Sequence, residues 1–590
     1  MAIPTLPDIL ERRAVDRPRD RAYTFLEDGE REREMLTWLD LHASSMNLAA
    51  AFAEIVPPGS RVLLLFPPGL SFLSAFLASV RAGTIAVLSY PPTGGTGDRI
   101  VARLRGIAAD AGFSLVVAPA VIHAKRRELT ALLPELTDAP WMNSDEVARA
   151  ASGFAGNRRT TTSDIALLQY TSGSTSRPRG VMVSQANLLH NLASSATLAG
   201  HNQDSVGVTW LPVNHDMGLI EGVLQPLFSG FPVWLMSPAA FLQRPARWLQ
   251  AISRFRATHS GGPDFAYELC ARRIPDRERE AIDLSSWRTA FNGSEPVRNG
   301  TLEAFQRAFG ECGFRWEAFR PAYGLAESTL LVTSGGAGEE PHLFRADSDA
   351  LRNGAVEPAL PGRPAVTLVS CGKPADGITV AIVDPERLTR CSHGRTGEIW
   401  ISGDSVAAGY WRRGTATDLT FRARMQPGGD GPFLRTGDLG FVRGGHLFVT
   451  GRIKDLLIVR GLKHYPQDVE LSVERADPGI RPHASAAFNL VREQASIAVA
   501  AELEPRLTRR SHAMRDFPAI ANAIAQAVSA AHGFVPAVIA LVEPGSLPRT
   551  TSGKIERYRC HDVLENPSAV LHLWTPDAIA APPYQRRAAS

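Results

Sequence analysis

Short apolar runs, each followed by an amphipathic stretch, are the feature that most restricts how this chain can fold. The runs at 62–66 (VLLLF), 84–90 (TIAVLSY) and 115–119 (LVVAP) precede segments with helical spacing. Strands of a parallel sheet have this composition, because helices cover both faces of the sheet. The series continues at 166–171, 232–237 and 257–262. The pattern predicts an α/β chain of packed sheets with covering helices.

The pattern changes after Arg452. Strand-like runs lie at 456–461, 484–491 and 495–503, and helix-like segments at 466–476 and 517–533. We therefore expect a large N-terminal domain over residues 1–452 and a small α+β C-terminal domain over 454–590, the second of ordinary domain size.

Composition narrows the class of protein. The chain has 590 residues, 44% of them hydrophobic and 21% charged, as in ordinary globular proteins. Its 63 basic and 60 acidic side chains give a net charge of +3, without the basic excess typical of nucleic-acid binding. The five cysteines form no CxxC pair, which argues against zinc sites and a disulfide framework. We expect a reducing, cytoplasmic location and no nucleic-acid partner.

Neither of the two long uncharged stretches is expected to cross a membrane. The stretch at 62–80 is cut by Pro67, Pro68 and Gly69, and the stretch at 222–243 contains three prolines. A membrane span needs about 20 unbroken apolar residues. The start of the chain, MAIPTLPDILERR, has no basic segment followed by an apolar run, so no signal peptide is predicted.

A series of short polar motifs follows the predicted strands. The first, 170–180 (YTSGSTSRPRG), is rich in hydroxyls and glycine, and its backbone N–H groups can wrap a phosphate. It lacks the end of a Walker A loop, and alone it could equally be a solvated turn. The later motifs are 215–218 (HDMG), 292–296 (NGSEP), 323–328 (YGLAES), 397–400 (GEIW), 435–438 (RTGD), 451–455 (GRIKD) and 551–554 (TSGK).

In this order the motifs resemble those of the adenylate-forming superfamily, which contains acyl-CoA synthetases, adenylation domains of peptide synthetases and luciferases. The resemblance covers nearly the whole chain, and 210–270, 323–328 and 460–470 look like the fatty acyl-AMP ligases. It implies a large domain of packed mixed sheets and a small, mobile C-terminal domain.

Three positions depart from the usual motifs of the superfamily. Ser176 and Arg179 replace the usual Gly and Lys of the first loop. Ala326 replaces the usual Thr, as expected in a fatty acyl-AMP ligase.

The resemblance implies ATP and Mg²⁺ as cofactors and assigns residues to each. Glu327 would hold Mg²⁺, a hard cation that prefers carboxylate and phosphate oxygens. Asp438 would accept both ribose hydroxyls, as an ionised carboxylate can, and Arg452 would support Asp438 or the phosphate. The other expected nucleotide-binding residues are Thr171, Ser172, Gly173, Ser174 and Thr175 at the phosphates, and Tyr323, stacked on adenine, with Ser294, Glu295, Gly324 and Ser328 beside it.

Lys554, His215 and Glu327 are the expected catalytic residues. Lysine is scarce in this arginine-rich chain, and a compact ammonium at Lys554 fits between a carboxylate and the α-phosphate better than a guanidinium would. His215 would lie near the carboxylate and the thiol, although a structural histidine is nearly as good an interpretation. Lys454 resembles a hinge about which the small domain turns.

Two further segments bear on the substrates. The apolar stretch after Gly218 and residues 261–267 are expected to line an acyl pocket, although they could equally be core. About residues 339–365 form extra sequence that contains Asn353-Gly354, a strong hairpin signal. This resembles the insertion of fatty acyl-AMP ligases, thought to restrain the small domain from the pose that would admit CoA.

The sequence therefore predicts an enzyme that activates a medium- to long-chain fatty acid as acyl-adenylate and transfers it to the phosphopantetheine thiol of an acyl carrier protein. A fatty acyl-CoA synthetase is the first alternative. A non-catalytic adenylate or fatty-acid sensor is the second, and the intact Glu327, Asp438 and Lys554 argue against it.

Overall fold

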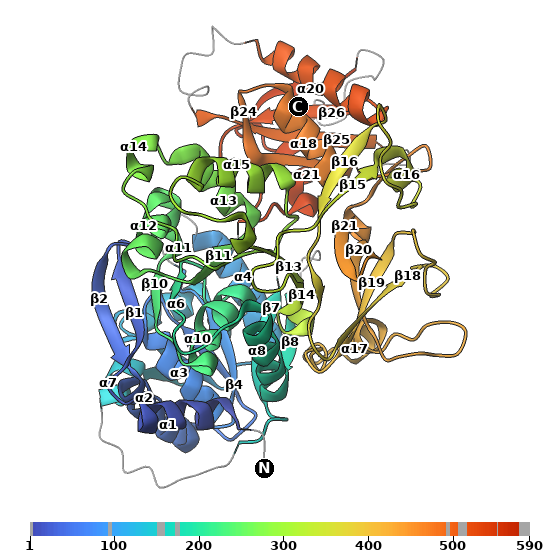
Figure 1. Ribbon diagram of the computed structural model, residues 1–590. Coiled ribbons are helices and arrows are strands. Elements are labelled where there is room, and N and C mark those ends of the chain that lie inside the picture. The colour runs from blue at the N-terminus through green and yellow to red at the C-terminus, as the bar shows by residue number, and fades with distance from the viewer. Residues whose placement is uncertain are drawn as a thin grey trace, which may run out of the picture.

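Two large sheets form the body of the protein (Figure 1). The computed structural model describes residues 4–92, 97–149, 160–171, 178–490, 496–505, 516–550 and 553–576. The first sheet has the order β6-β5-β3-β4-β7-β8, and all its pairs are parallel except β7–β8. Its strands are β3 (Arg61–Leu65), β4 (Ile85–Ser89), β5 (Leu115–Ala118), β6 (Trp141–Asn143), β7 (Ile165–Thr171) and β8 (Arg179–Ser184).

The second sheet has the order β17-β14-β13-β12-β11-β9-β10-β1-β2. Its central pairs are parallel, and β2, β14 and β17 add antiparallel edges. Its strands are β1 (Arg21–Glu27), β2 (Arg31–Thr37), β9 (Gly207–Thr209), β10 (Val233–Met236), β11 (His259–Gly262), β12 (Thr289–Asn292), β13 (Phe319–Gly324), β14 (Leu331–Ser334) and β17 (Lys373–Pro374).

Helices lie between the two sheets and on both outer faces. The middle layer contains α2 (Trp38–Ile55), α3 (Ser71–Arg81) and α8 (Gln185–Ala199), whose apolar side chains share one core with Val62 and Leu64 of β3 and with Val233 of β10. Leu63 and Leu65 of β3 point into a separate core on the other face. Strand β3 is thus buried on both faces, which explains its continuous apolar sequence.

The remaining helices of this part complete the layers. They are α1 (Leu6–Asp16), α4 (Gly97–Ala111), α5 (Ala120–His123), α6 (Arg126–Leu132), α7 (Ser144–Arg149), α9 (Asp216–Leu219), α10 (Gln225–Ser229), α11 (Pro238–Gln243), α12 (Ala246–Phe255), α13 (Asp264–Arg273), α14 (Asp276–Arg279), α15 (Asn299–Phe309) and α17 (Gly414–Phe421). Within the described ranges, every helix is too short or too polar to span a membrane.

An antiparallel sheet that the sequence analysis did not predict follows these layers. It consists of β18 (Ile378–Val383), β19 (Gly397–Gly403), β20 (Leu434–Arg443) and β21 (His446–Arg452). The expectation of strand–helix alternation up to about residue 450 is therefore wrong for this region, where successive strands pair antiparallel and α17 alone, among the described residues, intervenes between β19 and β20.

The C-terminal unit has its own sheet and cores. Its elements are β22 (Leu457–Val459), β23 (Leu462–His464), α18 (Pro466–Ala476), β24 (Ile480–Leu490), β25 (Ser496–Leu503), α20 (Phe517–His532), β26 (Val538–Val542), α21 (Cys560–Leu564) and β27 (Val570–Trp574). Val469, Val499 and Ile524 belong to a core that includes no residue before Leu457. The predicted fold class, a large α/β part of mixed sheets with a small α+β part, is confirmed.

The extra sequence at about 339–365 lies between the antiparallel sheet and the C-terminal unit (Figure 1). Strands β15 (Leu343–Asp347) and β16 (Ala365–Val369) pair there, with helix α16 (Ser348–Arg352) between them. The prediction of a hairpin turn at Asn353-Gly354 is wrong. Asp347 caps α16 by accepting from the N–H groups of Asp349 and Ala350, and Gly354 follows the helix end with φ +73°.

Candidate active site

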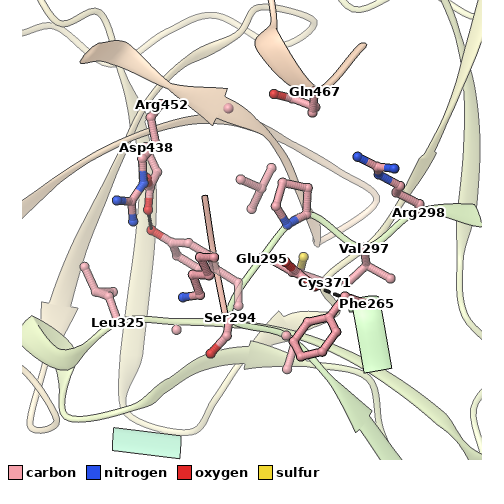
Figure 2. Close-up of a pocket in the computed structure, with 18 of the residues that line it drawn as sticks. Phe265, Ser294, Glu295, Val297, Arg298, Leu325, Cys371, Asp438, Arg452 and Gln467 are labelled. Carbon is pink, nitrogen blue, oxygen red and sulfur yellow. Dashed lines mark hydrogen bonds and ion pairs between the residues drawn. The ribbon is translucent and has the colours of Figure 1, made fainter. Parts of the chain in front are cut away.

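Motifs from both parts of the chain meet at one cavity of about 1090 Å³ (Figure 2). Of the predicted site residues, the cavity is lined by His215, Ser294, Glu295, Tyr323, Gly324, Glu327, Asp438, Arg452 and Lys554. Lys454 lines it too. Residues 172–177, which include most of the predicted phosphate loop, lie outside the described residues, and only the backbone of Thr171 is described.

The carboxyl end of β12 places Ser294 and Glu295 at the cavity. Ser294 has φ +70°, a left-handed conformation that is uncommon outside glycine and is often found at functional sites. The side chain of Glu295 accepts a hydrogen bond from the backbone N–H of Phe265 at 2.7 Å. In Figure 2, Ser294, Glu295 and Phe265 lie together on one side of the cavity, across from Asp438 and Arg452.

The neighbouring strand β13 ends at Tyr323 and Gly324. A Cβ atom on Gly324 would lie 1.8 Å from the carbonyl oxygen of Leu330, so only glycine fits this close approach. Ser328 is fully buried and does not line the cavity. The structure therefore gives no support to the expectation that Ser328 contacts the nucleotide.

Tyr323, Asp438 and Arg452 form a chain of contacts on one wall. The Tyr323 hydroxyl donates to Asp438 Oδ2 at 2.8 Å, and Arg452 Nε lies 2.8 Å from Asp438 Oδ1. The Asp438 charge raises the pKa of the Arg452 guanidinium, and burial, together with that charge, raises the pKa of the Tyr323 hydroxyl. Because a carboxylate has about four lone-pair sites, Asp438 can accept two further donors.

Glu327 has a partner that the sequence analysis missed. The Tyr410 hydroxyl donates to Glu327 Oε1 at 2.8 Å, and the guanidinium carbon of Arg179 lies 5.3 Å from the centre of the Tyr410 ring. Burial raises the pKa of Glu327, and the hydrogen bond from Tyr410 opposes this shift. No sequence motif marks Tyr410, which is 83 residues from Glu327.

His215 Nδ1 lies 2.6 Å from Oδ1 of Asp216, its neighbour in the chain. Burial alone would raise the pKa of Asp216, but its interactions with His215 and Lys554 lower this pKa below its usual value. Asp216 was not assigned a role from sequence, although it stands inside the HDMG motif.

A tight loop of the C-terminal unit positions Lys554. The backbone N–H of Thr550 donates to the Lys554 carbonyl at 2.8 Å, and the Lys554 N–H donates to Thr550 Oγ1 at 3.1 Å. Arg549 donates to the carbonyls of Gly553 at 3.0 Å and His483 at 2.9 Å. Burial lowers the pKa of the Lys554 ammonium, while Asp216 and Glu295 raise it. Thr551 and Ser552 lie outside the described residues.

Ion pairs hold the C-terminal unit over the cavity. Arg298 Nη1 lies 2.8 Å from Glu474 Oε2, and Arg272 Nη1 lies 3.0 Å from Glu504 Oε1. The extra segment adds a third contact, since Arg352 Nη2 donates to the carbonyl of Ala531 at 2.6 Å. In this arrangement Lys554 faces the residues contributed by the large sheets.

The cavity continues from this site as a channel along the second sheet, lined there by both apolar and polar residues. Thr289 and Phe291 of β12 and Arg320 and Ala322 of β13 line it, and residues two apart on a strand share a face. Ser195, Leu198 and Ala199, on one face of α8, line it as well. Of the two stretches expected either to line an acyl pocket or to be core, Ile220, Val223, Leu224 and Tyr267 pack in the cores and do not line the cavity. Phe265 does line the cavity.

The site fits a cation only together with phosphate oxygens. Within the described ranges, no group of three or more His, Cys, Asp or Glu side chains is placed to hold a metal ion. Mg²⁺ is commonly bound by one or two carboxylates, water and substrate phosphates, so a single cavity-facing carboxylate such as Glu327 is compatible with it.

Comparisons with known proteins agree with this geometry. Residues 10–411 match the family model of AMP-binding enzymes, and 454–565 match the AMP domain of Disco-interacting protein 2-like proteins. The chain is 41% identical to JamA of Moorena producens, a medium-chain fatty acid–acyl carrier protein ligase, over 94% of each chain. It is 34% identical to TtuA of Teredinibacter turnerae, a ligase of the same description, over 95% of this chain and 93% of TtuA. A crystal structure of a fatty acid AMP ligase from Legionella pneumophila superposes with a TM-score of 0.74 at 38% identity, over 98% of each chain.

Proposed function

Because this chain belongs to the family of AMP-binding enzymes, we propose that it uses ATP to activate a medium- to long-chain fatty acid as an acyl-adenylate. The acyl group then passes to the phosphopantetheine thiol of an acyl carrier protein. One observation carries the proposal: Lys554 of the C-terminal unit lines the same cavity as His215, Glu327 and Asp438, and this cavity continues as a channel along the second sheet. The names of JamA and TtuA favour the medium-chain end of the range.

The first step joins the fatty carboxylate to the α-phosphorus of ATP. A carboxylate oxygen forms the new bond as the bond between the α-phosphorus and the bridging oxygen to the β-phosphate breaks, and pyrophosphate leaves. Lys554 stabilises negative charge on the carboxylate and the α-phosphate, and Asp438 holds the ribose hydroxyls. Tyr323, anchored through its hydroxyl, stacks on adenine beside Ser294, Glu295 and Gly324. Catalysis is mainly positioning and charge stabilisation.

The remaining nucleotide contacts complete this assignment. We assign the β- and γ-phosphates to Thr171, Ser172, Gly173, Ser174 and Thr175, of which 172–175 lie outside the described residues, and Arg452 supports Asp438. Glu327 holds Mg²⁺, which, when bound, neutralises charge on the phosphate oxygens. In the second step the thiol attacks the acyl carbonyl, AMP leaves, and His215 lies near the reacting carbonyl.

Two further assignments belong to this proposal. The domain boundary falls at residues 452–454, where β21 ends and the 3₁₀ turn Ile453–Asp455 begins. The protein works in the cytoplasm, which its five free cysteines favour.

The function is tested by supplying ATP, Mg²⁺ and fatty acids of graded length, with either CoA or a holo-acyl carrier protein. We expect mass spectrometry to detect acyl-AMP without a thiol, and an acyl thioester only with the carrier protein. Efficient acyl-CoA synthesis would instead favour the alternative, a fatty acyl-CoA synthetase. Binding of ATP or fatty acid without any release of pyrophosphate would favour the second alternative, a non-catalytic adenylate or fatty-acid sensor.

We assign the choice between CoA and the acyl carrier protein to the extra segment at about residues 339–365. Phe344, Leu351 and Val356 of this segment share a core with Phe441 and Phe448 of the antiparallel sheet and with Tyr465 of the C-terminal unit. Together with the bond from Arg352 to Ala531, this core restrains the C-terminal unit in its present position. Deleting the whole segment would remove β15 and expose Phe441 and Phe448, so a single substitution is the sharper test.

We expect Arg352→Ala to retain adenylation and to form measurable acyl-CoA, which the wild type does not. The substitution removes the charged hydrogen bond to Ala531 and a local ion pair with Asp349. A shift of about 1.4 kcal/mol changes the ratio of two domain positions tenfold. Mass spectrometry of the thioester products checks this. Arg345→Ala, which removes an exposed arginine from β15, is the matched control. A folded Arg352→Ala enzyme that still ignores CoA would place the discrimination elsewhere.

A further inference from the structure

A polar cluster lines the channel at a distance from the residues assigned to the nucleotide. Arg320 stands three residues before Tyr323 on β13, about 10 Å away at the usual rise of a strand. Glu221 follows Asp216 by five residues, in the π-helical turn Ile220–Leu224. Such turns are rare and are often found at functional sites. Glu221, Arg320 and Ser195 of α8 all line the cavity.

The cluster is connected by hydrogen bonds but is not fully paired. Ser195 Oγ donates to Glu221 Oε2 at 2.9 Å, and His201 Nε2 lies 3.5 Å from Glu221 Oε1. Arg320 Nη1 donates to the carbonyls of Leu198, at 3.0 Å, and Gly335. Arg320 is 2% exposed, and its Nε and Nη2 have no hydrogen-bond partner in the part of the chain that the structure describes. Because those two nitrogens are themselves buried, the group that the channel presents is the carboxyl of Glu221, whose side chain is 12% exposed.

A carboxyl group that lines a cavity keeps hydrogen-bonding capacity, and ordered water usually occupies such a site. A fully saturated tail that reached this point would displace that water without replacing its hydrogen bonds, which disfavours binding. A hydroxyl at the end of the tail would replace them. Burial raises the pKa of Glu221 to about 7, so its carboxyl group can accept or donate a hydrogen bond near neutral pH.

We infer that Glu221, Ser195 and Arg320 recognise a hydrogen-bonding group, such as a hydroxyl, at or near the distal end of the acyl chain. These residues therefore determine specificity and take no part in the chemical step. The inference rests on the proposed function, because it assigns the channel to the acyl chain.

The test compares saturated fatty acids of graded length with their ω-hydroxy counterparts, with pyrophosphate release as the measure of kcat/KM. At chain lengths that reach the cluster, we expect the wild type to prefer the hydroxy acid by about tenfold or more, because sites built to bond a hydroxyl reject analogues without it. Shorter pairs should react equally. Glu221→Leu should abolish or reverse the preference, and Glu221→Gln, which retains hydrogen-bonding atoms, should keep most of it.

Equal rates for both acids at every length in the wild type would overturn the inference, as would an unchanged ratio in Glu221→Leu. If Glu221→Leu does not fold, as judged by its melting temperature, Ser195→Ala replaces it and should lower the preference. The proposed function fails separately, if no acid of any length releases pyrophosphate. Adenylation of saturated acids without any preference refutes only the present inference.

Discussion

Lys554→Ala is expected to slow adenylation by about 10²–10³-fold, the usual loss on removing one preorganised charge stabiliser. Asp216 and Glu295 place negative charge around this ammonium, and the Thr550–Lys554 turn fixes its backbone. Alanine removes the positive charge and leaves the turn, since both backbone bonds remain. Pyrophosphate release measures the first step, and transfer of pre-formed acyl-AMP to the carrier protein measures the second.

Two variants make this test specific. Lys463→Ala removes an exposed lysine from β23 and should leave both steps unchanged. Lys554→Arg keeps the charge but places a planar guanidinium where a compact ammonium lies, so we expect little recovery. Near-normal pyrophosphate release by Lys554→Ala, with an unchanged melting temperature, would remove Lys554 from the catalytic residues.

The same residue predicts a pH dependence. Burial lowers the pKa of Lys554 below its ordinary value of 10.5, so its proton is lost at a lower pH than for an exposed lysine. Because the charged form is the active one, adenylation should fall as pH rises through this lowered pKa.

Sequence reasoning succeeded where the information is local. Motifs at strand ends, such as 292–296 at the end of β12, are contiguous, and their order carries the resemblance that implied one shared site. Pairs formed across the fold were not predictable, because Tyr323 meets Asp438 only when β13 and β20 are brought together. The same holds for Tyr410 and Glu327. No local signal connects these residues.

The failed prediction at the Asn353-Gly354 turn and the open choice between acyl pocket and core also depended on contacts that the local sequence does not encode. Asn353-Gly354 suits a hairpin turn and the end of a helix equally well. The N-terminal cap at Asp347 stabilises the helix α16 that ends there. Ile220, Val223 and Leu224 are apolar, and apolar residues that line a channel cannot be told from core residues by composition. The structure identified the lining residues instead. They occupy alternate positions on β12 and β13, and the register of these two strands decides which positions share a face.

Lys454→Pro is expected to separate the two half-reactions. Lys454 lies in the 3₁₀ turn Ile453–Asp455, between β21, whose last residue Arg452 contacts Asp438, and β22 of the C-terminal unit. Proline fixes φ near −65°, a value that a 3₁₀ turn already has. The substitution should therefore favour the present arrangement, in which Lys554 faces the cavity, and oppose rotation of the C-terminal unit to any other.

We expect adenylation by Lys454→Pro to fall by no more than about tenfold, because proline also disfavours the helical backbone of the preceding Ile453. Thioester formation should fall by about 10²-fold or more if it requires the C-terminal unit to turn, as rigidly gated steps do. Lys454→Ala is the control: it removes the same side chain but leaves the backbone free, so both steps should stay within about threefold of each other. Equal losses of both steps in Lys454→Pro, or no loss of either, would show that the chain does not turn at this residue.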